Sequence, residues 1–188
     1  MSYTPYTGEF TEKILTVEQS WAQEPTGYNR TATAYLPDTP AMSGKLPVVI
    51  DLHGFGGKGT KRWKDIGDQI IFVGADGYCP PGEKCSWNVF GEPSKAPDTE
   101  FILELISKIG DEIPDADMDN VNIVGTSNGA ALTYLLLLST DSSRPFRRYV
   151  VFYDLHSWRY SNISELVFKK EFYFQSHSHV LQSDRCTI

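Results

Sequence analysis

Apolar and polar residues alternate in two segments near the start of the chain. Residues Glu9 to Val17 show this alternation, and Thr31 to Leu36 repeat it after a segment that contains Gly27. Alternation with a period of two is typical of strands with one buried face, and an intervening glycine favours a turn. The pattern predicts an antiparallel strand pair with its turn at Gly27.

The pattern then changes to short, nearly continuous apolar runs. Such runs are typical of strands that are covered on both faces, as in a parallel sheet. Four segments have this character: Leu46–Leu52, Ile70–Val73, Asn120–Val124 and Tyr149–Tyr153.

Two segments between these runs have helical character. Asp98–Glu112 carries apolar residues at helical spacing and acidic residues in its first turn, and Asn128–Leu138 is rich in Ala and Leu. Strands that alternate with helices predict an α/β fold. We expect a mostly parallel sheet with helices on both faces, preceded by the antiparallel pair.

Length, composition and charge narrow the class of protein. With 188 residues, of which 40% are hydrophobic, the chain is long enough for one domain with a buried core, residues 1–188. Its formal net charge of -7 argues against nucleic-acid binding, which needs a basic face. No apolar run reaches the roughly 18 residues of a membrane span, and no secretory signal is visible at the N-terminus, so the sequence leaves the localisation open.

A candidate nucleophile follows the third apolar run. Gly125-Thr126-Ser127-Asn128-Gly129 has the pattern G-x-S-x-G, with a predicted strand before it and a predicted helix after it. A nucleophilic serine in this pattern lies on a sharp strand-to-helix turn, where only small neighbours avoid a clash. The motif predicts that Ser127 is the catalytic nucleophile.

A glycine-rich segment follows the first apolar run. His53-Gly54-Phe55-Gly56-Gly57 lacks the patterns of the phosphate-binding loops, so we interpret it as an oxyanion loop. We expect the backbone N–H groups of Phe55 and Asn128 to form the oxyanion hole. We interpret His53 as a residue that holds this loop, rather than as a catalytic base.

Several motifs together resemble the polyhydroxybutyrate depolymerase and feruloyl esterase group of α/β-hydrolases. The resemblance covers about residues 46–148. The motifs that carry it, in chain order, are His53-Gly54-Phe55-Gly56-Gly57, Ala75-Asp76-Gly77, Ser86-Trp87-Asn88, Glu92-Pro93-Ser94-Lys95-Ala96-Pro97-Asp98 and Gly125-Thr126-Ser127-Asn128-Gly129-Ala130-Ala131.

The resemblance implies a serine carboxylic ester hydrolase that acts on polyesters or on aryl and acetyl esters of polysaccharides. It implies a protein of a usually secreted group that needs no metal and no organic cofactor, with a small-molecule or polymeric ester as its substrate. Trp87 would form an aromatic wall of the substrate cleft; the alternative is a core tryptophan. The sequence does not indicate an oligomeric state.

The resemblance ends after Arg148. The group would next supply an acid and a histidine to activate Ser127, and no matching motif follows. Candidates exist, but we assign neither role to any of them: Asp154, Asp184, His156, His177 and His179. Residues 157–188 are an atypical tail, in which Ser164–Phe174 is compatible with either a helix or a strand.

We therefore expect the α/β-hydrolase domain to be truncated after its nucleophile half. In that case the strand at Tyr149–Tyr153 would be an uncovered sheet edge. Such a chain would have little or no turnover, because a serine hydroxyl needs a base and an orienting acid. The alternatives are a catalytically dead relative that binds carbohydrate or polyester, and a truncated product without function.

Two cysteines flank a Pro-Pro-Gly turn. Cys79 and Cys85 either close a small loop as a disulfide or remain two loop thiols, and the spacing is compatible with both.

Overall fold

The structure is a computed structural model of the chain. It describes residues 7–40, 44–59, 67–89, 91–138, 146–152, 172–176 and 179–181, and from residue 146 onward it describes the backbone alone. No helix in these ranges is both long enough and apolar enough to cross a membrane.

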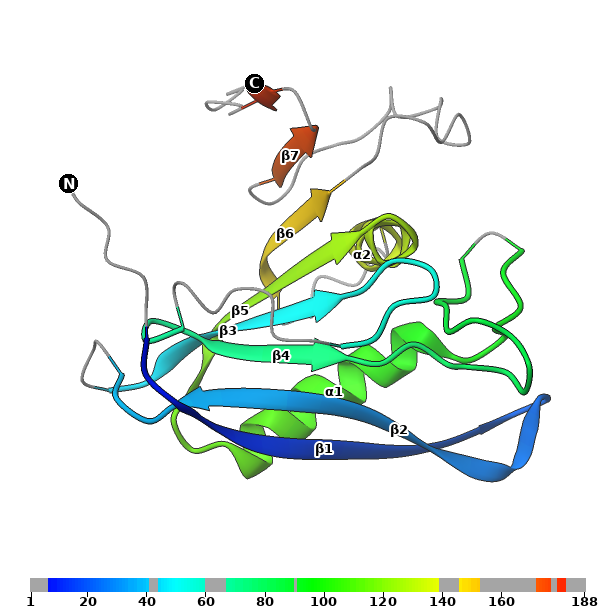
Figure 1. The fold of residues 1–188 in the computed structure, drawn as a ribbon, viewed down its shortest axis with the longest axis horizontal. Coiled ribbons are helices and arrows are strands. Elements are labelled where there is room, and N and C mark those ends of the chain that lie inside the picture. The colour runs from blue at the N-terminus through cyan, green and yellow to red at the C-terminus, as the bar shows by residue number, and fades with distance from the viewer. Residues whose placement is uncertain are drawn as a thin grey trace.

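The described strands form one eight-stranded sheet in the order β1-β2-β4-β3-β5-β6-β7-β8 (Figure 1). The strands are β1 Phe10–Trp21, β2 Glu24–Pro37, β3 Leu46–Leu52, β4 Ile71–Ala75, β5 Ala116–Thr126, β6 Phe146–Phe152, β7 Phe172–Ser176 and β8 His179–Leu181. The strands from β4 through β3, β5 and β6 to β7 are parallel to one another. The pairs β1–β2, β2–β4 and β7–β8 are antiparallel. The predicted parallel sheet and its N-terminal antiparallel pair are confirmed.

The turn of the first hairpin is not at Gly27. It is formed by Ala22 and Gln23, and Gly27 lies inside β2 with a φ of 98°. It lies opposite the point where the register between β1 and β2 shifts, between Gln19 and Trp21. A positive-φ glycine is compatible with a β-bulge as well as with a turn, so the sequence pattern placed the turn wrongly.

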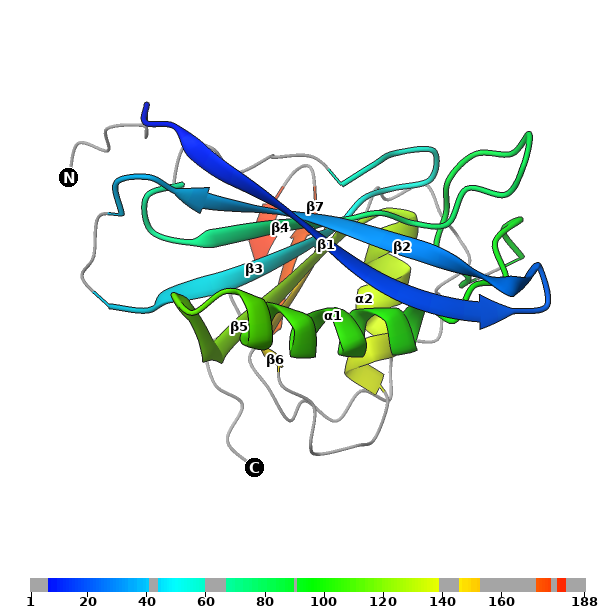
Figure 2. The same ribbon diagram turned by 90° about the horizontal axis from the view of Figure 1, so that it is seen from below.

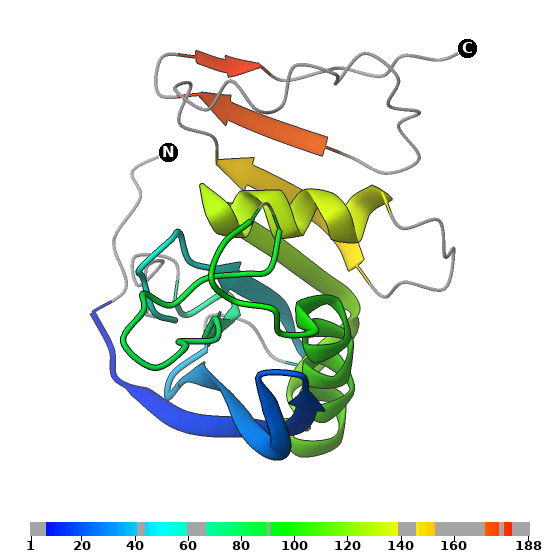
Figure 3. The same cartoon turned by 90° about the vertical axis from the view of Figure 1, so that its right-hand side faces the viewer.

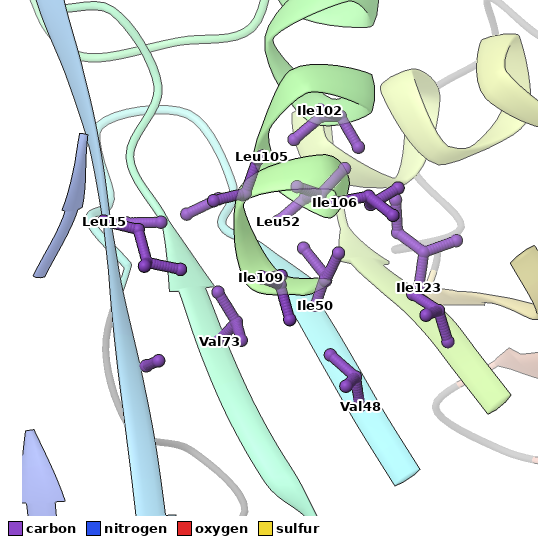
Figure 4. Close-up of a cluster of buried hydrophobic side chains, with 14 of the residues drawn as sticks. Leu15, Val48, Ile50, Leu52, Val73, Ile102, Leu105, Ile106, Ile109 and Ile123 are labelled. Carbon is purple, nitrogen blue, oxygen red and sulfur yellow. The ribbon is translucent and has the colours of Figure 1, made fainter. Parts of the chain in front are cut away.

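Two helices have the predicted bounds, α1 Asp98–Glu112 and α2 Asn128–Leu138. Both pack on the same face of the sheet, and the expected helices on the other face do not occur among the described residues. The main core cluster joins residues of α1 and α2 to alternate residues of β3, such as Val48 and Ile50 (Figures 2 and 4). In the described part of the chain the opposite face has only a small cluster of Tyr35, Ile70 and Phe72. The apolar runs predicted a sheet that is covered on both faces, but they carried no information on which elements cover each face.

The sheet continues beyond β6. β7 pairs with β6 and β8 pairs with β7, so the predicted uncovered edge at Tyr149–Tyr153 is wrong. Of the undecided segment Ser164–Phe174, residues 172–174 belong to β7 and the remainder lies outside the described residues.

The carboxyl ends of β3, β4 and β5 lie at one end of the molecule. Figure 3 faces this end, where the loop after β3, in cyan, and the loop after β4, in green, lie in front of the strands. Because chemistry in open α/β sheets is concentrated at the carboxyl ends of the strands, this end is where a site is expected.

Candidate active site

Ser127 lies on the sharp turn between β5 and α2. Strand β5 ends at Thr126 and α2 begins at Asn128, so Ser127 is the single residue between them. It has a φ of 52°, and it is the only non-glycine residue with a positive φ in the described ranges. Its side chain is exposed. A left-handed backbone costs a non-glycine residue about 1–2 kcal/mol, and strain of this kind concentrates at functional sites.

The two glycines of the motif are required by close packing. A Cβ at Gly125 would lie 2.3 Å from the hydroxyl oxygen of Thr133, and a Cβ at Gly129 would lie 2.2 Å from the carbonyl oxygen of Leu52. The start of α2 is therefore pressed against the ends of β3 and β5. Any side chain at either position would push the helix away and displace Ser127.

The oxyanion loop, His53–Gly57, reaches the serine. A Cβ at Gly54 would lie 3.4 Å from the Cβ of Ser127, so the loop passes directly beside Ser127. Two of its N–H groups are already used: Gly56 N–H donates to the carbonyl of Cys85 (2.8 Å) and Gly57 N–H donates to the carbonyl of Gly54 (3.0 Å). Among the hydrogen bonds between described residues, none uses the N–H of Phe55.

Asn128 supplies the second expected donor from the first position of α2. The N–H groups in the first turn of a helix have no acceptor within the helix and carry a partial positive charge. The N–H of Asn128 therefore suits a developing oxyanion on a substrate bonded to Ser127. The structure thus brings Ser127, Asn128 and the oxyanion loop into one place.

His53 holds the oxyanion loop, as the sequence analysis interpreted it. Its side chain is fully buried, and its Nε2 accepts a hydrogen bond from Gly77 N–H (2.9 Å). The proton is then on Nδ1, which donates to the carbonyl of Gly54 (2.7 Å). With both ring nitrogens engaged inside the protein, His53 does not serve as a base for Ser127.

Asp76 supports the same loop from the end of β4, a role that sequence reasoning missed. Its carboxylate accepts hydrogen bonds from Gly59 N–H (2.9 Å) and from the Thr31 hydroxyl (2.9 Å). It therefore joins Gly59, two residues beyond the oxyanion loop, to β2. The signal was present in the Ala75-Asp76-Gly77 motif, but only the fold brings its partners together.

Trp87 is a core residue and not a wall of the substrate cleft. Its side chain is 0% exposed and belongs to the main core cluster. The indole N–H donates to the carbonyl of His53 (2.8 Å), which satisfies its polar atom inside the protein. The predicted substrate-binding role is therefore corrected to a structural one, since a buried indole offers no surface to a substrate.

The side chain of Asn128 has a second role that the sequence did not reveal. Its amide oxygen accepts a hydrogen bond from Trp87 N–H (2.7 Å), and its amide nitrogen donates to the carbonyl of Trp87 (3.2 Å). The start of α2 is thus bonded to the backbone of the loop after β4.

A buried ion pair is bonded to the loop after β4. Arg30 and Asp98 are each about 1% exposed and their side chains are 2.6 Å apart. The other carboxylate oxygen of Asp98 accepts a hydrogen bond from Asn88 N–H (2.6 Å). Burial raises the pKa of the Asp98 carboxyl, and the charge of Arg30 and the bond from Asn88 oppose that rise. Removing either charge would leave the other unpaired inside the protein.

Cys79 and Cys85 form a disulfide, which decides the question that the spacing left open. Beside it, the side chain of Lys84 lies over the ring of Phe55, with Nζ 5.9 Å from the ring centroid. Phe55 is 49% exposed.

The candidate acids and bases after Ser127 are not among the described side chains. Asp154, His156, His177 and Asp184 lie outside the described residues, and of His179 only the backbone, in β8, is described. No group of three or more His, Cys, Asp or Glu residues able to hold a metal ion occurs in the part of the chain that the structure describes.

Neither a protein-family model nor a curated protein matches this sequence. Solved structures do match. The chain is similar to a fungal esterase from Rhizomucor miehei, with a TM-score of 0.53 and 19% identity over 79% of this chain and 45% of that one. It is also similar to brefeldin A esterase, a bacterial homologue of human hormone-sensitive lipase, with a TM-score of 0.51 and 18% identity over 78% of this chain and 41% of that one.

A third similar structure is the acylaminoacyl peptidase of Pyrococcus horikoshii, with a TM-score of 0.50 and 16% identity over 78% of this chain and 24% of that one. The chain therefore spans less than half the length of each of these three structures. At these identities the similarity concerns the fold, and the three neighbours are two esterases and a peptidase. The described part of the chain has the fold of the α/β-hydrolases.

Proposed function

We propose that the site at Ser127 is that of a serine carboxylic ester hydrolase. The observation that carries the proposal is the backbone of Ser127, which has a φ of 52° while its side chain remains exposed between β5 and α2. A strained, exposed serine at this point matches what a nucleophile elbow requires.

The reaction would proceed through an acyl-enzyme. The Ser127 hydroxyl oxygen attacks the ester carbonyl carbon and loses its proton, which leaves with the alcohol. The carbonyl oxygen becomes an oxyanion in the tetrahedral intermediate, where the N–H groups of Phe55 and Asn128 would stabilise it. Water then attacks the acyl group, releases the acid and restores the serine.

We propose polyesters, or aryl and acetyl esters of polysaccharides, as the substrate class. The motifs between residues 46 and 148 support this choice, since they resemble enzymes of those activities. The rival function is a catalytically dead relative that binds carbohydrate or polyester through Trp87 and its neighbours. It is weakened because the side chain of Trp87 is buried, which leaves only the neighbours for such binding.

The test is hydrolysis of a short-chain p-nitrophenyl ester by the whole chain and by its Ser127→Ala variant. We expect slow hydrolysis, because no motif assigns the acid and base, and we expect the variant to fall to the background rate. A matched control is Ser94→Ala, which removes a buried serine far along the chain from the elbow. Equal rates in the wild type and in Ser127→Ala would refute the proposal.

A second readout is covalent labelling by a fluorophosphonate, which reports the nucleophile without requiring deacylation. The expected result is a single adduct that mass spectrometry places on Ser127. An adduct on another residue, in a folded protein, would refute the assignment of the nucleophile.

A further inference from the structure

A short hairpin after β4 is cross-linked at two adjacent positions. The disulfide hairpin, Gly77–Trp87, has an antiparallel bridge between Tyr78 and Ser86, in which Ser86 N–H donates to the Tyr78 carbonyl (2.9 Å). The Cys79–Cys85 disulfide follows directly. An isolated pair of short strands is marginally stable in water, so the disulfide is the stronger constraint on how the two arms align.

Both arms of this hairpin bond to the oxyanion loop. From the first arm, Gly77 N–H donates to Nε2 of His53 (2.9 Å). From the second arm, the carbonyl of Cys85 accepts the N–H of Gly56 (2.8 Å). These two bonds hold the loop at His53 and at Gly56. Phe55 lies between them, directly before Gly56, and its N–H is the expected oxyanion donor. The alignment of the arms therefore sets where that N–H lies.

The end of the hairpin bonds to both halves of the site. Trp87 donates its indole N–H to the carbonyl of His53, at the start of the oxyanion loop (2.8 Å). The backbone of Trp87 also exchanges two hydrogen bonds with the Asn128 side chain, at the start of α2 (2.7 and 3.2 Å). One residue thus connects the segment that carries the first oxyanion donor to the residue that carries the second.

We propose that the disulfide hairpin is the positioning element of the oxyanion hole, and that the Cys79–Cys85 bond keeps the two N–H donors at their working separation. The catalytic part of this inference rests on the proposed function, whereas the mechanical connection rests only on the hydrogen bonds above. Both cysteines are half-buried and residues 81–84 between them are exposed, so a small dithiol can reach the bond.

Reduction would uncouple the arms. A dithiol such as dithiothreitol supplies two electrons and two protons, the S–S bond breaks to give two thiols, and the dithiol becomes a cyclic disulfide. Without the S–S bond the second arm can shift relative to the first. The Cys85 carbonyl then moves more freely, and so does the Gly56 N–H that donates to it. Because an oxyanion donor acts on the transition state, its displacement lowers kcat and leaves KM nearly unchanged.

The first experiment measures amide hydrogen exchange in the whole chain, oxidised and reduced, and in the variant Cys79→Ser/Cys85→Ser. We expect exchange of the peptide that covers His53–Gly57 to rise about tenfold when the disulfide is absent. The peptide of α1, Asp98–Glu112, is the internal reference and should not change. The matched control is Cys186→Ser, which removes the third cysteine but keeps the Cys79–Cys85 bond. It should behave like the wild type, with faster exchange in His53–Gly57 only in the presence of the reductant.

The second experiment measures hydrolysis of p-nitrophenyl acetate in the same samples. Loss of one oxyanion donor lowers kcat about 100-fold, so we expect a fall of about 10- to 100-fold with KM within about twofold. Reoxidation of the reduced wild type should restore both exchange and kcat. If the double-serine variant fails to fold, the test rests on the reduced wild type. Unchanged amide exchange in α1 then shows that the reduced protein is still folded.

Unchanged exchange in His53–Gly57, or a loosened loop with unaltered kcat, would overturn the proposal. If the oxidised chain has no Ser127-dependent hydrolysis at all, the proposed function fails, and the exchange measurement alone then decides whether the hairpin holds the loop. The two failures are therefore distinguishable.

Discussion

Replacing Gly129 with alanine tests whether α2 lies as close to the sheet as the nucleophile turn requires. The new Cβ would lie 2.2 Å from the Leu52 carbonyl oxygen and 2.6 Å from the His53 carbonyl oxygen. Both are backbone atoms at the end of β3, so neither can rotate away. The start of α2 would have to move outward by about 0.8 Å before that contact became tolerable.

The expected loss of unfolding free energy comes from the packing between α2 and the sheet, which this movement loosens. Leu132 and Leu136 on α2 are fully buried, and each contributes about 1.5–3 kcal/mol to stability. A gap of 0.5–1 Å forfeits roughly a quarter to a half of such packing energy. With residual strain of about 1–3 kcal/mol and a helix-propensity gain of about 1 kcal/mol, the expected net loss is about 3 kcal/mol.

Gly110 provides the matched control, because it is an exposed glycine inside α1. A Cβ there would lie 3.4 Å from the nearest atom, Cγ of the flexible Met118. The same substitution should stabilise the protein at this position by about 0.5–1 kcal/mol through helix propensity and chain entropy.

The assay is thermal and urea unfolding followed by circular dichroism. For a chain of this length each kcal/mol shifts Tm by roughly 2–4 °C, so we expect Gly129→Ala to melt about 6–12 °C lower and Gly110→Ala a few degrees higher. A Gly129→Ala protein as stable as the wild type would refute the close approach of α2 to β3, and with it the strained turn at Ser127.

Three further substitutions test the structure around the site. Arg30→Met should cost about 3 kcal/mol in urea unfolding by leaving Asp98 buried without its partner, and adding Asp98→Asn should recover part of that loss; no recovery would contradict the pairing. Burial, together with a hydrogen bond to a carboxylate, raises the pKa of Tyr78 from 10.0 to about 12. As pH rises from 10 to 12, Tyr78 therefore loses its proton in the unfolded state before it does so in the folded state, which favours unfolding. Between pH 9 and pH 11 the wild type should lose about 1 kcal/mol more of its unfolding free energy than Tyr78→Phe does. Equal losses in the two proteins would contradict the raised pKa. Asn128→Ala, which retains the backbone N–H but removes two hydrogen bonds to the Trp87 backbone, should lower the unfolding free energy by about 2 kcal/mol; an unchanged value would contradict those bonds.

Periodicity and motif order were sufficient for much of the fold. The bounds of β3, α1 and α2 agree with the predicted segments, because apolar runs and helical spacing are local properties of the chain. The placement of Ser127 between a strand and a helix followed from the same patterns. The turn at Gly27 failed because a positive-φ glycine serves bulges and turns equally.

What the sequence could not decide depends on partners that are distant along the chain. Trp87 is apolar and aromatic in either role, and only the packed core and the His53 carbonyl that accepts its N–H make it structural. The functions of Asp76 and the Asn128 side chain depend on backbone groups 17 and 41 residues away. The sequence by itself therefore determined the bounds of β3, α1 and α2 and the position of Ser127 between a strand and a helix, because local patterns specify local structure. The tertiary structure alone decided which face the helices cover, how the disulfide hairpin bonds to both the His53–Gly57 loop and Asn128, and why its tryptophan is buried, because these depend on contacts that no local pattern encodes.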